Sequence, residues 1–227
     1  MMKLNQLLKL GGIVLLLSTL LGCGRLWSGG KISLPGREDL FRMTIEQQLH
    51  QKYGDAFTVE QIEFEKANMA FHKGTCKAMV SSDRYEGTFT ARVDNDMENL
   101  TDDYPRLYWN DNIEARVRKA LDQVEDLQET EWKVVYVLSE QVWKEEDALD
   151  EYLAQGDTYL DLTVTLPADL EQAADTVHQL RDALQEEQLQ YAIACSCGGG
   201  TVILTEKKGR QPLTDEQVYG KLERSLS

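Results

Sequence analysis

The sequence predicts an α+β protein, in which antiparallel sheets pack against helices and the C-terminal half is ferredoxin-like. The hydrophobic pattern of the first half reads helix, three strands, helix. The pattern of the second half contains the order strand, helix, strand, strand, helix, which is that of a ferredoxin-type sandwich. A length of 227 residues with 42% apolar residues is ordinary for one or two globular domains with ample core.

The chain begins with the pattern of an export signal. Residues 1–10 carry Lys3 and Lys9 and no acid, and the 13-residue stretch 10–22, which begins at Leu10, is uncharged and rich in Leu, Ile and Val. A spanning helix needs roughly 20 apolar residues, so this segment is too short for a permanent transmembrane anchor. We therefore expect residues 1–22 to be a signal peptide.

The signal ends in Leu20-Leu21-Gly22-Cys23, which resembles the lipobox of bacterial lipoproteins. The resemblance implies cleavage before Cys23 and a diacylglyceryl group on its sulfur, which would hold the protein on the outer face of the cell membrane. Two acyl chains anchor stably, whereas one holds only marginally. The alternative is an ordinary signal peptide with an incidental cysteine. Residues 23–37 contain several glycines and serines and a proline, so we expect them to form a flexible tether.

An N-terminal α+β unit is expected over residues 38–128. Leu40, Phe41, Ile45 and Leu49 recur at helical spacing before Gly54, which is placed to end the helix. Strand-like runs follow at Phe57–Phe64, Thr75–Ser81 and Gly87–Val93, with broken alternation that suggests a bulge near Gln61. An amphipathic helix is expected over Asn110–Leu127, with an earlier start at Asp103 as the alternative.

A C-terminal α+β unit is expected over residues 129–227. Its expected elements are a strand at Trp132–Leu138, a short helix at Glu145–Leu153, a strand at Tyr159–Leu166, a helix at Leu170–Leu184, a hairpin of Gln190–Cys195 and Thr201–Thr205, and a helix at Thr214–Leu226. Thr214 and Gln217 fit a capping box at the start of the last helix.

Two segments of the N-terminal unit carry a second resemblance. Lys52 to Phe57, read as KYGDAF, and Thr101 to Tyr104, read as TDDY, are similar to segments of small exported lipoproteins of Gram-positive bacteria that have no assigned activity. The similarity covers roughly residues 40–110. It implies a class of protein and no mechanism.

The net negative charge of the chain disfavours some classes of binding partner. Removal of residues 1–22 would take away two lysines and no acid, so the formal charge of −15 would become −17. An anionic body is repelled by nucleic acid and by anionic lipid, so we expect no nucleic-acid partner and attachment to the membrane through lipid on Cys23. Cationic peptides, divalent ions or basic proteins would suit such a surface, and so would a role in solubility alone.

Two cysteines near the end of the chain are the candidates for chemistry. Cys195 and Cys197 are two residues apart in a predicted strand, so both are expected on one half-buried face. The simplest interpretation is a structural role, in which both cysteines pack as small apolar side chains. The alternatives are a redox thiol pair, or a metal site completed by Cys76 and His72. The spacing matches no recognisable zinc motif.

A loop of acids is the candidate for calcium. Asp94, Asp96 and Glu98 occupy the first three ligand positions of an EF-hand-like loop. However, Asn99 stands where a glycine is wanted and Pro105 where the bidentate glutamate belongs, so a solvated loop is the ordinary explanation.

These observations predict a non-catalytic binding or scaffold protein with no cofactor, no metal and an unidentified protein or peptide partner. The histidines form no H-E-x-x-H arrangement, and no G-x-S-x-G elbow is present. The alternative is a surface thiol-redox protein, or another enzyme, that uses Cys195 and Cys197.

Overall fold

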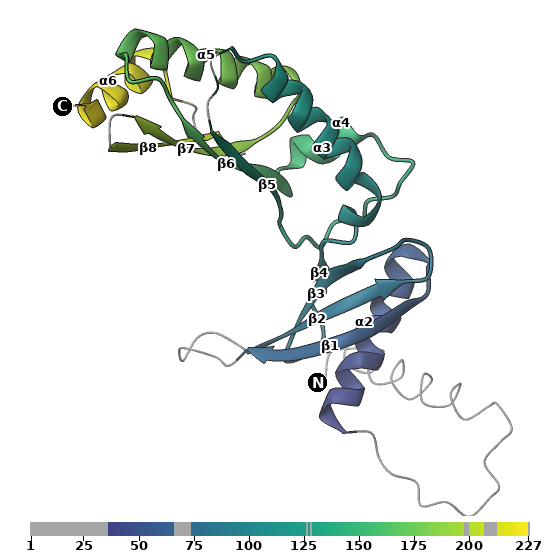
Figure 1. Cartoon of the computed structure of the whole chain (residues 1–227). Helices are drawn as coiled ribbons and strands as arrows, with labels where there is room; N and C mark the ends of the chain where they lie inside the picture. Colours follow the sequence, from purple (N-terminus) through teal and green to yellow (C-terminus); the bar gives the residue numbers. More distant parts are fainter. Residues whose placement is uncertain are drawn as a thin grey trace, which may run out of the picture. The chain divides into compact units, whose positions relative to one another are not determined.

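The computed structural model describes residues 36–65, 74–125, 127, 129–197, 200–206 and 213–226 (Figure 1). Within these residues the fold is α+β, as the sequence predicts, with helices packed against two four-stranded sheets. The expected signal peptide (1–22) and nearly all of the expected tether (23–37) lie outside the described residues. No helix in the described part of the chain has both the length and the apolar character that a membrane span requires.

The first sheet packs against one helix, α2 (Arg37–Tyr53). Its strands lie in chain order and are all antiparallel: β1 (Phe57–Glu65), β2 (Thr75–Ser82), β3 (Thr88–Asp94) and β4 (Thr101–Asp102). Phe41, Ile45 and Leu49 form the buried stripe of α2, in agreement with the predicted period. The other face of the sheet carries no helix in the described residues.

Two local features of this unit confirm the sequence analysis. The register of β1 against β2 shifts between Val59 and Gln61, which is the expected bulge. Gly54 ends α2 in the left-handed region, at φ 86°, and donates its N–H to the carbonyl of His50. Glycine is favoured there because it lacks the Cβ that makes this backbone region costly for other residues.

The helix α3 (Arg106–Asp122) starts earlier and ends earlier than expected over Asn110–Leu127. Pro105 is the N-cap residue, where a missing N–H costs nothing, so the helix begins between the two expected starts, Asp103 and Asn110. We expected this helix to belong to the N-terminal unit, which was placed at 38–128. Its buried residues instead join the hydrophobic core of the second sheet, so the two cores divide near residue 105.

The second sheet contains β5 (Thr130–Tyr136), β6 (Thr158–Thr165), β7 (Tyr191–Cys197) and β8 (Gly200–Glu206), again in chain order. The outer pairs are antiparallel, and the central pair, β6 and β7, is parallel. The parallel pair arises because α5 (Leu170–Glu186) carries the chain back between the two strands. Figure 1 shows α3, α5 and α6 (Asp215–Leu226) on one face of this sheet, the two-layer arrangement expected for the C-terminal half.

The helix α4 (Leu149–Gln155) begins four residues later than expected. The reason is a turn before it: the N–H of Lys144 donates to Oδ2 of Asp147 at 2.8 Å, and the N–H of Asp147 donates to the carbonyl of Lys144 at 3.0 Å. An aspartate that bonds nearby backbone in this way competes with helix formation. At the start of α6, Thr214 and Gln217 form the predicted capping box, with reciprocal bonds of 3.0 and 3.3 Å.

Buried side chains form two separate hydrophobic clusters, one for each sheet. The first lies between α2 and its sheet, and the second between the second sheet and α3, α5 and α6. Tyr108 on α3 packs against both clusters. The residues around Tyr108 therefore lie where the two cores meet.

Candidate functional site

The two segments quoted above, KYGDAF and TDDY, lie together in the folded chain. Lys52 at the end of α2 donates to Oδ2 of Asp102 at 2.7 Å, and the hydroxyl of Tyr53 donates to Oδ1 of the same carboxylate at 2.8 Å. The Asp102 side chain is completely buried, and that of Lys52 is only 10% exposed. A buried charge of this kind is tolerated because a partner of opposite sign and further hydrogen bonds compensate it.

Asp102 also binds a segment much later in the chain. Its N–H donates to the carbonyl of Ser139 at 3.1 Å, and the N–H of Ser139 donates back to the carbonyl of Asp102 at 3.0 Å. Lys52 Nζ donates to the same Ser139 carbonyl at 3.1 Å. The buried ion pair thus fixes the segment that connects β5 with α4.

The neighbouring Asp103 has a different environment. Its Oδ1 accepts the N–H of Thr90 at 2.5 Å, which ties the third residue of the TDDY segment to β3. Burial raises the pKa of the Asp103 carboxyl above its ordinary value, although the bond from Thr90 acts in the opposite direction.

Beside Asp102, four tyrosines, Tyr53, Tyr85, Tyr104 and Tyr108, line a pocket of about 120 Å³, and the last three pack against one another. The ring centroids of Tyr85, Tyr104 and Tyr108 form a triangle with separations of 5.9 Å (Tyr85 to Tyr104), 5.4 Å (Tyr85 to Tyr108) and 5.7 Å (Tyr104 to Tyr108). These spacings are those of tilted and edge-to-face aromatic contacts. Tyr85 comes from the turn between β2 and β3, Tyr104 from the residues after β4, and Tyr108 from the first turn of α3.

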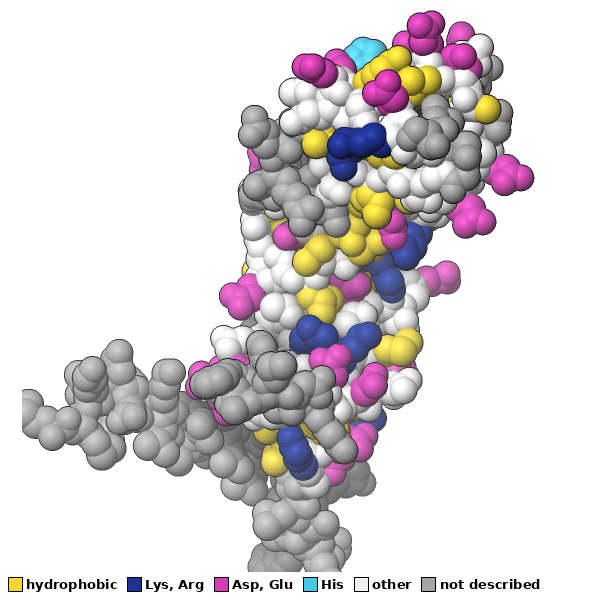
Figure 2. All heavy atoms as spheres, turned by 90° about the vertical axis from the view of Figure 1, so that its left-hand side faces the viewer, with side chains coloured by type: hydrophobic (Ala, Val, Ile, Leu, Met, Phe, Trp, Pro, Cys, Tyr) yellow, Lys and Arg dark blue, Asp and Glu magenta, His cyan; other side chains and the backbone are white. Residues whose placement is uncertain are grey.

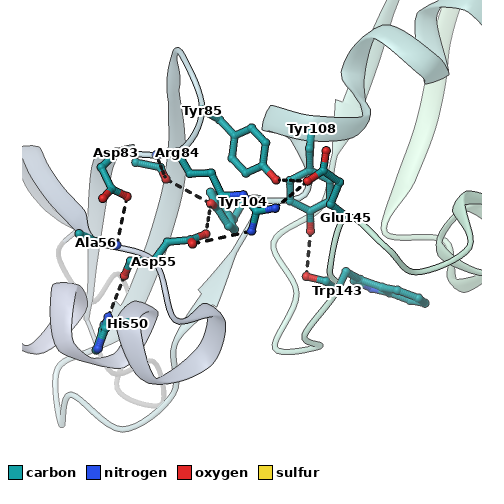
Figure 3. A network of polar contacts seen from close by, with 11 residues as sticks. His50, Asp55, Ala56, Asp83, Arg84, Tyr85, Tyr104, Tyr108, Trp143 and Glu145 are labelled. Atoms are coloured by element: carbon teal, nitrogen blue, oxygen red, sulfur yellow. Dashed lines mark hydrogen bonds and ion pairs between the residues drawn. The ribbon is translucent and has the colours of Figure 1, made fainter.

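The charged residues that line the pocket are Asp55, Arg84, Lys144, Glu145 and Glu146. Figure 3 shows Asp55, Arg84 and Glu145 with their polar contacts. The hydroxyl of Tyr104 donates to Asp55 at 2.6 Å, and the hydroxyl of Tyr85 donates to Glu145 at 2.6 Å. Arg84 donates to the same oxygen of Glu145 at 2.8 Å and lies 3.9 Å from Asp55. The Tyr108 hydroxyl instead donates to the carbonyl of Trp143 at 2.8 Å.

The phenols of the pocket are neutral hydrogen-bond donors at physiological pH. Burial, followed by the hydrogen bond to Glu145, raises the pKa of Tyr85 to about 12. Burial also raises the pKa of Tyr104 and of Tyr108. A phenol with a raised pKa is a poor general base or nucleophile, so the arrangement suits binding of a polar or charged group better than proton abstraction.

The cysteines and acids singled out in the sequence do not meet at this pocket. Cys195 is completely buried in the second core, opposite Val202 on β8, as expected for a packing residue. Cys197 is the last residue of β7, and its side chain lies outside the described part of the structure. Cys23, the candidate for lipidation, also lies outside the described residues.

Two of the proposed metal ligands, Cys76 and Cys195, belong to different hydrophobic cores. Cys76 is completely buried in the first core, whereas Cys195 belongs to the second, and His72 lies outside the described residues. Burial raises the pKa of the Cys76 thiol to about 11. In the part of the chain that the structure describes, no three His, Cys, Asp or Glu side chains are grouped as metal ligands.

In the acidic loop of residues 94–99, the carboxylate of Asp94 accepts hydrogen bonds from other residues of the same loop. One carboxylate oxygen of Asp94 accepts the N–H of Glu98 at 2.9 Å, and the other accepts the side-chain amide of Asn99 at 2.6 Å. Asp96 and Glu98 are exposed. Asp94 thus stabilises the turn after β3, where Met97 adopts a positive φ of 60°.

Sequence reasoning missed Arg84, Tyr85 and Glu145. The first two lie in a turn between strands and the third in an acidic stretch, so each resembles an ordinary solvated residue in the sequence. The only signal was the KYGDAF and TDDY resemblance, which contains Asp55 and Tyr104 but says nothing of their neighbours.

Comparisons with known proteins add little to this geometry. No family model matches the chain, and no curated protein matches it. Among solved structures, the chain is similar to a DUF5037 family protein from Ruminococcus gnavus ATCC 29149, at 14% identity and a TM-score of 0.36. That likeness covers 68% of this chain and 73% of the other.

Proposed function

We propose that this chain is a lipid-anchored extracytoplasmic lipoprotein that acts as a non-catalytic binding or scaffold module at the membrane surface. The observation that carries the anchor is Cys23, which follows a short apolar signal in the position of a lipobox cysteine. The tether of residues 23–37 would keep the folded part close to the headgroups. Because the chain is strongly acidic, lipid rather than charge would hold it there.

The pocket of Tyr85, Tyr104 and Tyr108 supports the binding role. It combines apolar ring faces with a few fixed polar groups, which is the usual composition of a ligand site. The raised pKa values of these phenols favour hydrogen bonding over acid-base catalysis. Cys195 is buried, which argues against the redox alternative, because a thiol in a packed core is a poor nucleophile.

The anchor is tested by membrane fractionation of cells that express the full chain. Cys23→Ser should move the protein from the membrane to the soluble extracytoplasmic fraction and abolish incorporation of labelled fatty acid. Ser28→Ala, in the same tether, should behave as the wild type. A Cys23→Ser variant that remains fully membrane-bound would contradict the proposal, because the apolar segment of residues 10–22 would then be the anchor.

A further inference from the structure

The chain itself places two cationic residues, Arg84 and Lys144, at the tyrosine pocket, and Arg84 contacts its aromatic and acidic groups. The guanidinium carbon of Arg84 lies 5.1 Å from the centroid of the Tyr85 ring, and the group contacts Glu145 at 2.8 Å and Asp55 at 3.9 Å. One aromatic face and two carboxylates are the partners that a guanidinium prefers. The lining of the pocket thus already combines a guanidinium with an aromatic face and two carboxylates.

The carboxylates are held in place without Arg84. Asp55 is fixed by the hydroxyl of Tyr104 and Glu145 by the hydroxyl of Tyr85, each at 2.6 Å. These bonds remain if the arginine leaves. The pocket is therefore organised in advance for a cation, which reduces the ordering cost of binding one.

Arg84 itself is held loosely. Its side chain is 50% exposed, and so is that of Glu145. Exposed ion pairs contribute little because water and salt screen them. Arg84 can therefore rotate into solvent at small cost. An incoming guanidinium would meet the same screening at Glu145, so its affinity must come mainly from Asp55, which is only 18% exposed, and from the tyrosine rings.

The charge of the molecule favours such a ligand. The chain has 39 Asp and Glu residues against 24 Lys and Arg, and acidic side chains are scattered over the face seen in Figure 2. A negative field raises the local concentration of cations and speeds their association. The pocket volume of about 120 Å³ is the space that remains with Arg84 in place, and departure of the Arg84 side chain would enlarge it.

We propose that the tyrosine pocket binds the guanidinium of an arginine side chain in a basic peptide, which displaces Arg84. This inference rests on the proposed binding function and names its ligand class. Arg84 then acts as an internal occupant that must leave before the peptide binds. The peptide backbone would remain outside the pocket.

The probe for this site is N-acetyl-arginine amide, titrated calorimetrically into the full-length chain purified from membranes in a non-ionic detergent. N-acetyl-citrulline amide is the matched control, because it has nearly the same shape and no charge. We expect the arginine amide to bind at least tenfold more tightly than the citrulline amide. Equal binding of the two, or binding of neither, overturns the proposal.

Three variants test the role of Arg84. If it occupies the pocket about nine-tenths of the time, Arg84→Ala should tighten binding of the arginine amide about tenfold, since the competent state is no longer a minor one. Glu145→Gln should weaken binding several-fold. Arg118→Ala is the control, because Arg118 also contacts a carboxylate, Glu114 at 2.7 Å, and lies 5.8 Å from the ring centroid of Trp132, but it does not line the pocket.

A thermal melt of each variant identifies any that fails to fold, and Glu145→Gln tests the site independently of Arg84→Ala. Weaker binding in Arg84→Ala than in wild type overturns the displacement model, because Arg84 would then help to hold the ligand. The titration does not depend on the anchor. Failure to bind by a protein that fractionates with the membrane through Cys23 would reject the ligand class and leave the anchor intact.

Discussion

The carboxylate of Asp102 is a buried charge that accepts three hydrogen bonds. It has no exposed surface, and the bonds come from Lys52, Tyr53 and the N–H of Tyr104. Because the charge is completely desolvated, its stability depends on keeping the positive partner. The pair is therefore a more sensitive point than the exposed ion pairs of the same chain.

We predict that Lys52→Met lowers the free energy of unfolding by about 3 kcal/mol or more, since it leaves the Asp102 charge buried and unpaired. Methionine keeps most of the aliphatic volume, so the loss reports the charge rather than a cavity. Chemical denaturation by urea, followed by circular dichroism, measures it.

Lys133→Met is the control for this measurement. Lys133 pairs with Asp161 at 3.2 Å across the exposed face of β5 and β6, where the side chains are 71% and 44% exposed. Its loss should change stability by less than about 1 kcal/mol. Similar losses for the two variants would show that burial does not distinguish the two ion pairs.

At the scale of elements, the sequence correctly predicted three features that depend on residues close together in the chain. The bulge at Gln61, the end of α2 at Gly54 and the capping box of Thr214 and Gln217 each depend on residues within a few positions of one another. Backbone conformation and short-range hydrogen bonds decide such features, so the sequence is sufficient to find them.

A pair of glycines tests this element-scale argument. Gly54 has a φ of 86°, and an added Cβ would meet no atom within 4 Å, so Gly54→Ala should cost about 1–2 kcal/mol through backbone conformation alone. Gly220, within α6, has equally open surroundings but lies in a helix. Gly220→Ala should therefore stabilise by about 0.5–1 kcal/mol.

The midpoints of urea denaturation measure both changes. Opposite signs are the expected result, and the two substitutions introduce the same side chain into equally uncrowded positions. If Gly54→Ala were neutral, a left-handed requirement at the end of α2 could not be the reason for the glycine.

Contacts between elements that are distant in the chain could not be predicted from the sequence. The apolar stripe of α3 shows that one face is buried, but it does not show against which sheet, and the structure places it in the second core. The pairing of Lys52 with Asp102 and of Tyr85 with Glu145 joins residues 50 and 60 positions apart. Polar residues at such separations carry no periodicity, so the candidate site emerged only from the fold.

On the scale of the whole molecule, the described residues form two hydrophobic cores, and Tyr108 packs against both. The first core ends with Tyr104, and the second begins with Trp109. Between them, Tyr108 contacts the ring of Tyr104 at 5.7 Å and that of Trp109 at 4.9 Å. Its hydroxyl binds the carbonyl of Trp143 at 2.8 Å. Cooperative unfolding of the two cores should therefore depend strongly on this side chain.

We predict that the wild-type chain unfolds in one calorimetric transition and that Tyr108→Ala separates it into two. Removing the ring deletes the packing that transmits unfolding from one core to the other, so the van't Hoff enthalpy should fall below the calorimetric enthalpy. Tyr108→Phe keeps the ring and loses only the bond to Trp143, so it should lower the Tm and keep one transition. A single transition in Tyr108→Ala, with equal enthalpies, would mean that the buried Lys52, Asp102 and Ser139 contacts couple the cores by themselves.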